Sequence, residues 1–88
     1  MPTVFWKNGY RFFFVSFDCN EPMHIHVIYN EKECKYWLIN ETNVALADNY
    51  NFNNTQLNFV RKSIIDNYSL IKKVWNEHCK NYKKQSNG

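Results

Sequence analysis

The side chains whose types and spacing point most clearly to chemistry are two histidines, His24 and His26. They follow a proline-containing turn and alternate with the apolar residues Ile25 and Val27. Because side chains alternate between the two faces of a strand, we expect both imidazoles on one exposed face and both apolar side chains on the other. An imidazole pair can transfer protons, bind a metal, or contact an anion when protonated. The spacing therefore predicts a site, with a structural role in cross-strand stacking or hydrogen bonding as the alternative.

A metal ion at this pair would have too few protein ligands. Structural zinc takes about four protein ligands and catalytic zinc about three, whereas the histidine pair supplies only two. The nearest carboxylates, Asp18 and Glu33, could contribute, but nothing in the sequence fixes them beside the histidines. We therefore predict that the site uses no metal and no other cofactor.

The first part of the chain has the residue pattern of short antiparallel strands separated by turns. Asn8-Gly9 favours a tight hairpin turn. The aromatic run after it predicts a strand that is covered on both faces. The expected strands are Val4–Trp6, Tyr10–Phe17, His24–Tyr29, Glu33–Ile39 and Asn43–Leu46.

Pairing of the third and fourth expected strands predicts which side chains lie beside the histidines. A slip of one residue would move a whole apolar set into solvent, so the register follows from matching those sets. The matched residues are Ile25, Val27 and Tyr29 with Cys34, Tyr36 and Leu38. The opposite face then carries Glu33, Lys35 and Trp37 beside the histidine pair.

Basic and aromatic residues in this region are candidate contacts for a ligand. Lys35 could hold a phosphate or stabilise charge that develops on it, or it is an exposed lysine that discourages edge pairing. Arg11 either packs against aromatic rings or binds a phosphate through two hydrogen bonds from its guanidinium. Trp37 and Tyr36 could stack a base, while a partner interface or the core is the alternative for the tryptophan.

From Asn53 onward the spacing of apolar residues becomes helical. Asn53 with Gln56 three residues later matches a capping box. We expect helices at approximately Asn53–Asp66 and Ser69–Asn81, packed on the apolar face of the third strand. The predicted fold class is α+β, a four- to five-stranded antiparallel sheet with two C-terminal helices packed on one face.

Length, charge and cysteine content set further bounds. The 88 residues suit a single domain over residues 1–82, followed by a flexible polar and basic tail at residues 83–88. A net charge of +3 permits a nucleic-acid partner without requiring one. The widely spaced Cys19, Cys34 and Cys79 are predicted to be free thiols in a reducing compartment. No membrane span or secretory signal pattern is present, so we expect a cytoplasmic protein.

Four motifs are distributed along nearly the whole chain: Gly9-Tyr10-Arg11-Phe12-Phe13-Phe14, Pro22-x-His24-Ile25-His26-Val27, Lys35-Tyr36-Trp37-Leu38 and Trp75-Asn76-Glu77. Together they resemble one small prokaryotic family, known as domain of unknown function 4160. Met23 stands where members usually have a second proline, and His78 stands where members commonly have an apolar aromatic, which implies a core or boundary position. Members often lie beside a gene for a second small protein, an arrangement similar to a toxin–antitoxin pair. The resemblance therefore implies a toxin-like nuclease with a small, antitoxin-like protein partner.

Three classes of function remain. The leading one is a toxin–antitoxin-type, metal-independent ribonuclease, because RNA cleavage needs a base, an acid and a cation on the phosphate. His24 and His26, with Lys35 or Arg11, could supply all three. The second class is a non-catalytic module that binds RNA, single-stranded DNA or a nucleotide through its aromatic residues. The third is a protein-interaction inhibitor encoded by a mobile element, whose aromatic face docks a partner. None of these three functions needs a membrane. A homodimer is one assembly that the sequence allows.

Overall fold

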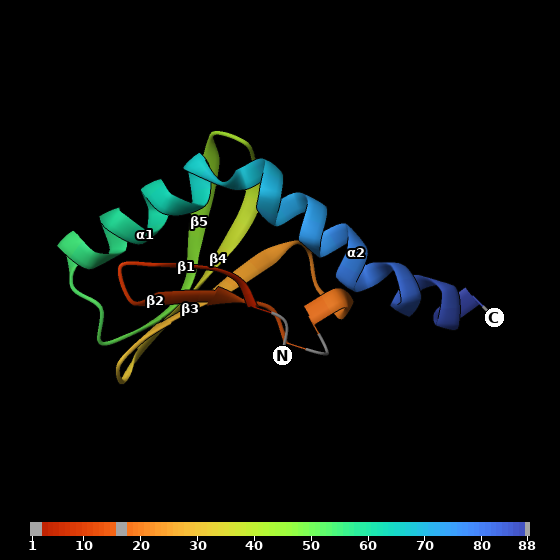
Figure 1. Ribbon diagram of the computed structural model, residues 1–88, viewed down its shortest axis with the longest axis horizontal. Helices are drawn as coiled ribbons and strands as arrows, with labels where there is room; N and C mark the ends of the chain where they lie inside the picture. Colours follow the sequence, from red (N-terminus) through yellow and green to blue (C-terminus); the bar gives the residue numbers. More distant parts are fainter. Residues whose placement is uncertain (1–2, 16–17, 88) are drawn as a thin grey trace.

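Five antiparallel strands, a short 3-10 helix and two C-terminal helices make up the described part of the chain (Figure 1). The computed structural model describes residues 3–15 and 18–87, with side chains as far as residue 80. The elements are β1 Thr3–Lys7, β2 Tyr10–Phe13, η1 Asp18–Asn20, β3 His24–Tyr29, β4 Lys32–Asn40, β5 Asn43–Tyr50, α1 Asn54–Asp66 and α2 Tyr68–Asn87. The strands pair in the order β1-β2-β3-β4-β5, which confirms the predicted α+β fold.

The turn between β1 and β2 has the geometry that its sequence predicts. Asn8 and Gly9 both have positive φ, at 52° and 85°. A tight turn of this kind needs positive φ at both central positions, which asparagine and glycine tolerate best. Gly9 also lies against the Tyr29 ring, because a Cβ at this position would come within 3.2 Å of that ring.

The predicted register between β3 and β4 is confirmed. Ile25 lies opposite Tyr36, and Val27 lies opposite Cys34. The alternate pairs are His24 with Trp37 and His26 with Lys35. The sheet therefore has one apolar face and one face that carries the histidines, which we call the histidine face.

The core lies between the apolar face of the sheet and the two helices, which run along the same side of the sheet in Figure 1. Ile25 and Val27 are fully buried and share one hydrophobic cluster with Val60, Ile64 and Ile71 of the helices. Burial of side chains of this size stabilises the fold by about 1.5–3 kcal/mol each. This packing confirms that both helices cover the face bearing Ile25 and Val27.

Hydrogen bonds attach α1 to the sheet and define where it starts. The Tyr36 hydroxyl donates to the carbonyl of Leu57 at 3.3 Å. Asn53 Oδ1 accepts from the Gln56 backbone N–H at 2.8 Å, and Gln56 Oε1 accepts from the Asn53 N–H at 3.0 Å. The predicted capping box is therefore confirmed.

The aromatic strand β2 is covered on both of its faces, as its sequence indicates. Phe12 and Phe14 are fully buried in the main core. Phe13 points to the histidine face, where its ring stacks on His26 with the ring centres 5.5 Å apart. The run of three phenylalanines thus links the core to the candidate site.

Two strand boundaries differ from the prediction by more than one residue. β5 continues to Tyr50 rather than ending at Leu46, because its pairing with β4 extends as far as Glu33. β2 ends at Phe13, which pairs with His26. Residues 16–17, the end of the predicted strand, lie outside the described residues.

The second helix is longer than predicted. It begins at Tyr68 and reaches Asn87, beyond the expected end at Asn81. The flexibility of residues 83–88 stays a prediction. In Figure 1, α2 passes η1 and continues beyond the edge of the sheet.

A disulfide joins η1 to α2, so the prediction of three free thiols is wrong. Cys19 and Cys79 are 60 residues apart in sequence, but the packing of η1 on α2 brings their Cα atoms to 5.5 Å, within disulfide range. Cys34 is the free cysteine, buried in the sheet. Burial, with the nearby Glu33 carboxylate adding to it, raises the pKa of the Cys34 thiol to about 12.

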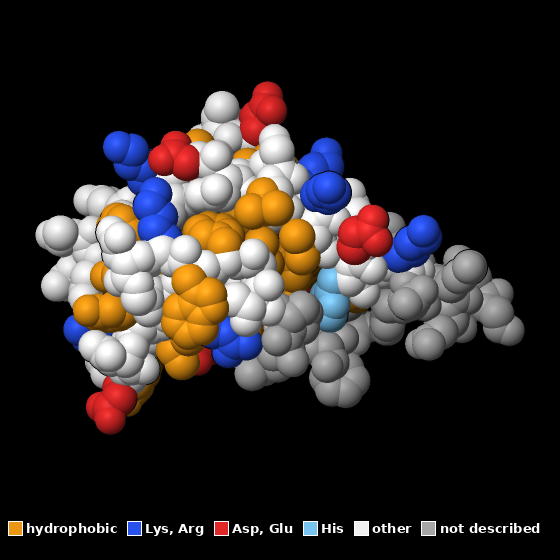
Figure 2. Space-filling view, in the orientation of Figure 1, with side chains coloured by type: hydrophobic (Ala, Val, Ile, Leu, Met, Phe, Trp, Pro, Cys, Tyr) orange, Lys and Arg blue, Asp and Glu red, His pale blue; other side chains and the backbone are white. Residues whose placement is uncertain are grey.

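Charged side chains of both signs are interspersed over the face shown in Figure 2. Hydrophobic side chains gather near the middle of that view, with Lys and Arg next to Asp and Glu around them. Among the residues that the structure describes, this face therefore carries no continuous basic patch.

Candidate active site

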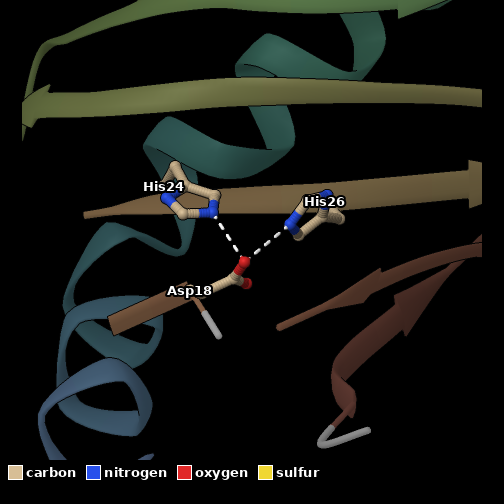
Figure 3. A group of neighbouring side chains, drawn as sticks. All are labelled: Asp18, His24 and His26. Atoms are coloured by element: carbon tan, nitrogen blue, oxygen red, sulfur yellow. Dashed lines mark hydrogen bonds and ion pairs between the residues drawn. The ribbon is translucent and has the colours of Figure 1, made fainter. Parts of the chain in front are cut away.

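The carboxylate of Asp18 lies between the two histidines of β3 (Figure 3). Asp18 Oδ1 is 2.9 Å from His24 Nε2 and 3.0 Å from His26 Nε2. The chain leaves β2, forms η1 and then enters β3, and this path brings Asp18 back over the start of the strand. The histidine pair is thus one part of a three-residue cluster.

Backbone hydrogen bonds hold Asp18 in place. Its Oδ2 accepts from the Val15 N–H at 2.8 Å, and its own N–H donates to the Val15 carbonyl at 3.2 Å. Burial alone would raise the pKa of the Asp18 carboxyl, but the hydrogen bond from Val15 and the contacts with His26 and His24 outweigh it and lower the pKa below its ordinary value. Asp18 is therefore ionised, and His26 Nε2–H donates to it.

His24 is fully buried, so the expectation of two exposed histidines is wrong at this position. Its ring packs edge-on against Trp37 and Trp75, with ring centres 5.3 and 5.4 Å away. The reason is that Trp75 of α2 and Asp18 of η1 both lie against the ring of His24, the first residue of β3. A buried ring cannot reach a macromolecular substrate, so His24 does not fit the predicted catalytic role.

Only one nitrogen of His24 makes a directed hydrogen bond. Nδ1–H donates to the Pro22 carbonyl at 2.8 Å, which makes Nδ1 the protonated nitrogen because a carbonyl can only accept. Nε2 forms an ion pair with Asp18 at 2.9 Å, and among the described residues it is buried without a hydrogen-bond partner. The buried Nε2 thus faces the carboxylate without being satisfied by it.

His26 is the accessible histidine of the pair. Its side chain is 16% exposed and stacks on Phe13. It lines a hollow of about 540 Å³ on the histidine face together with Ile28, Glu31, Glu33, Cys34, Lys35, Asp48 and Tyr50. With Nε2–H directed at Asp18, the nitrogen that can accept a proton is Nδ1.

Lys35 lies next to His26 across the strands, as predicted, and is only partly exposed. Its ammonium donates to Glu21 Oε1 at 2.7 Å and lies 4.4 Å from the centre of the Trp37 ring. The hydrogen bond from Lys35 lowers the pKa of the Glu21 carboxyl. The Lys35 charge is therefore present at the rim of the site but is shared with a carboxylate and an aromatic ring.

The remaining predicted site residues, Arg11, Trp37 and Tyr36, differ in how they lie relative to the cluster. Arg11 Nε donates to Thr3 Oγ1 at 2.8 Å, and its guanidinium lies 4.6 Å from the Phe13 ring centre. Arg11 is therefore packed against an aromatic ring, which was one of its two predicted roles. Trp37 is half-buried against His24. Tyr36 is on the opposite face and nearly fully buried, so the structure does not bring it to the histidines, and the prediction that it stacks a base is wrong.

Asp18 is the functional residue that the sequence pattern did not identify as central. The sequence shows it as a nearby carboxylate, and the turn between β2 and β3 is what carries it to the histidines. The other candidate carboxylate, Glu33, pairs with Ile28 and lines the hollow instead. An aspartate a few residues before a Pro-x-His-x-His motif is thus the sequence pattern that predicts such a cluster.

A five-stranded α+β protein with a buried carboxylate bound to a His-x-His strand is the class that this fold and site define. The chain belongs to the family described as Domain of unknown function (DUF4160), whose model matches residues 9–76. The match includes Asp18 and both histidines, and it confirms the resemblance seen in the sequence. No curated protein and no solved structure matches the chain. Within the part of the chain that the structure describes, no helix is long and apolar enough to cross a membrane.

Proposed function

We propose that this chain is a small ribonuclease of the toxin–antitoxin type. In this proposal His26 takes a proton from the substrate, and Asp18 orients the His26 ring. One observation carries the proposal: the buried, ionised Asp18 holds the accessible imidazole of His26 at the edge of a hollow that Lys35 also lines. A carboxylate that fixes one ring nitrogen leaves the other nitrogen as the base, and it stabilises the imidazolium that forms.

The chemistry requires no cofactor. His26 Nδ1 takes the proton of the ribose 2′-hydroxyl, and the 2′-oxygen forms a bond to the adjacent phosphorus. The bond from that phosphorus to the 5′-oxygen of the next nucleotide breaks, which leaves a 2′,3′-cyclic phosphate and a 5′-hydroxyl. The Lys35 ammonium stabilises the charge that develops on the phosphate and is the nearest acid for the leaving oxygen. His24 is a positioning residue in this scheme, because its buried ring contacts Asp18 and Trp37 but not the hollow.

Charge restricts where the RNA lies. The carboxylates of Glu31, Glu33 and Asp48 also line the hollow, and they disfavour a phosphate inside it. We therefore place the phosphate at the rim, where Lys35 replaces its contact with Glu21 by one with the phosphate. A cytoplasmic location is part of this proposal, because cellular RNA is found there.

Cleavage of a fluorescent RNA oligonucleotide by the metal-free chain, with a chelator present, tests the proposal. His26→Ala should lower the rate by about 10²–10⁴-fold. Lys35→Ala should weaken both binding and rate, while the matched control Lys73→Ala, an exposed lysine of α2, should change neither. Full activity of folded His26→Ala would rule out this mechanism.

A specific observation favours a protein partner on the same face. Trp6 and Tyr50 are both 65% exposed and Ile39 is 58% exposed. Trp6 pairs with Arg11, Tyr50 pairs with Glu33, and Ile39 alternates with Leu38 of the core, so all three belong to the histidine face. We propose that an antitoxin-like protein covers this face and blocks access to His26.

Co-purification with the product of the adjacent gene tests the partner proposal. Trp6→Ala and Tyr50→Ala should weaken the complex at least tenfold, because exposed aromatic residues are frequent interface anchors. Leu70→Ala, an exposed apolar residue of α2, is the matched control and should leave the complex intact. Equal weakening by all three variants would contradict the assignment of this face.

A further inference from the structure

We propose that Asp18, His24 and His26 together form a binding site for one divalent transition-metal ion of the zinc or cobalt class. The proposal does not depend on RNA being the substrate, and it concerns a second state of the cluster. One ligand atom from each residue lies within 4.8 Å of the others. The three atoms are His24 Nε2, His26 Nε2 and Asp18 Oδ1.

The ligand set is complete enough for zinc. Two imidazoles and one carboxylate form a common three-residue set at zinc sites that keep an open position. The sequence prediction of no metal rested on a count of two ligands. Asp18 supplies the third, so that argument no longer holds.

The buried His24 ring is the observation that points to a cation. Its Nε2 is fully buried, has no hydrogen-bond partner among the described residues and lies 2.9 Å from Asp18 Oδ1. With Nδ1–H donated to Pro22, a neutral ring directs a lone pair into the same space as an anionic oxygen. The lone pair and the carboxylate oxygen need a positive charge between them. A proton on Nε2 supplies it in the ion pair with Asp18, and a metal ion bound by both atoms can take the place of that proton.

Contacts around the cluster match those that orient metal ligands in proteins. A metal-binding histidine usually donates its second ring N–H to a carbonyl or carboxylate, as His24 does to Pro22. The ligating carboxylate is also usually hydrogen-bonded, as Asp18 Oδ2 is by the Val15 N–H. Both interactions leave the remaining atom of each side chain directed at the shared space.

Two of the three separations between the ligand atoms also suit a metal ion. Ligand atoms roughly 2.0–2.1 Å from zinc lie about 2.9–3.4 Å apart when the angle between them is about 90–110°. The observed separations of 2.9 and 3.0 Å from Asp18 to the two histidines fall within that range. His26, the partly exposed member, can adjust its ring to complete the coordination.

Metal binding changes the chemistry proposed for His26. A metal ion on Nε2 leaves the ring proton on Nδ1, so the nitrogen that would accept the substrate proton is no longer basic. The metal-loaded chain should therefore cleave RNA more slowly than the metal-free chain. On this basis zinc inhibits RNA cleavage by occupying the cluster of Asp18, His24 and His26.

Zinc content of the untagged, chelator-stripped chain after equilibration with Zn²⁺ alone and dialysis tests the inference. We expect one zinc per chain by elemental analysis, and an absorption spectrum of the Co²⁺ form with nitrogen and oxygen ligands. Asp18→Asn, His24→Gln and His26→Gln should each weaken zinc binding at least tenfold. Glu33→Gln, the nearby carboxylate outside the cluster, is the matched control and should bind zinc as the wild type does.

Buried substitutions in the cluster can prevent folding, so two further readouts keep the test decisive. His26→Gln changes the most exposed of the three residues, and its folding is checked by circular dichroism. X-ray absorption of the zinc-loaded wild type should show two imidazoles. Substoichiometric zinc, or zinc binding that survives in folded His26→Gln, would overturn the inference. RNA cleavage measured on the same samples separates the two proposals. If the metal-free chain does not cleave RNA, the proposed function fails, while the zinc stoichiometry still tests the metal site.

Discussion

At the scale of single residues, the two histidines have different environments although they are two positions apart. His24 is enclosed by Trp37 and Trp75, whereas His26 reaches the hollow. The alternation of the strand places both on one face, but it does not specify which of them α2 covers. Asp18 connects them, and it gives the pair a common chemistry.

The burial difference has a direct consequence for stability. His24→Ala should lower the free energy of unfolding by about 1–3 kcal/mol, since it leaves a cavity and removes the hydrogen bond to Pro22. His26→Ala should cost less, because its ring is partly exposed. Urea denaturation of both variants measures the order, and a larger loss for His26→Ala would contradict the structure.

The free thiol of Cys34 should be unreactive at neutral pH. Its pKa is raised to about 12 from the ordinary value of 9.0, chiefly by burial. A raised pKa in the folded state means that the neutral thiol favours folding, so this stabilisation is full below pH 9.0 and is lost as the pH rises toward about 12. Mass spectrometry after iodoacetamide treatment at pH 8 should show slow alkylation of the native chain and rapid alkylation in urea. Equal rates would show that Cys34 is accessible.

At the scale of elements, a count of free thiols tests the disulfide that joins η1 to α2. Unfolding without reductant should expose one thiol per chain, that of Cys34, rather than the three of the sequence. Reduction should lower stability by about 2–4 kcal/mol, because the bond closes a loop between residues 60 positions apart. A Cys19→Ser, Cys79→Ser double variant should not respond to reductant. Three thiols in the oxidised, unfolded sample would contradict the bond.

The start of α1 offers a second test of an element. Asn53→Ala removes the side chain that accepts the Gln56 N–H and should cost about 1 kcal/mol by thermal denaturation. Asn54→Ala, one residue inside the helix, is the control and should change stability little. An equal loss in both variants would mean that the capping box does not stabilise this helix.

Local patterns in the sequence were sufficient to predict most of the elements. The strand alternation fixed the register of β3 on β4, and the Asn53 and Gln56 spacing fixed the start of α1. Long-range packing was not predictable in this way. The disulfide, the cover that α2 gives to His24, and the return of Asp18 to β3 depend on contacts between segments with no shared local signal.

At the scale of the whole molecule, the helices pack on the apolar face of the sheet, and only Trp75 of α2 also contacts the site among the described rings, at the buried His24. The helices fill the apolar face, and the histidine face keeps exposed aromatic residues at Trp6 and Tyr50 around the hollow. A domain of this size needs one face for its core, which leaves the other for ligands and partners. This division is the reason that catalysis, metal binding and a protein partner are all proposed on one surface.

The most direct test of the account is the rate of RNA cleavage by metal-free Asp18→Asn beside the wild type, with Asp66→Asn at the exposed end of α1 as the control. Asparagine keeps the shape of the side chain but removes the charge that orients and stabilises His26. We expect a loss of about 10²–10⁴-fold in rate for Asp18→Asn and none for Asp66→Asn. Wild-type cleavage by folded Asp18→Asn would contradict the central claim that Asp18 and His26 work together.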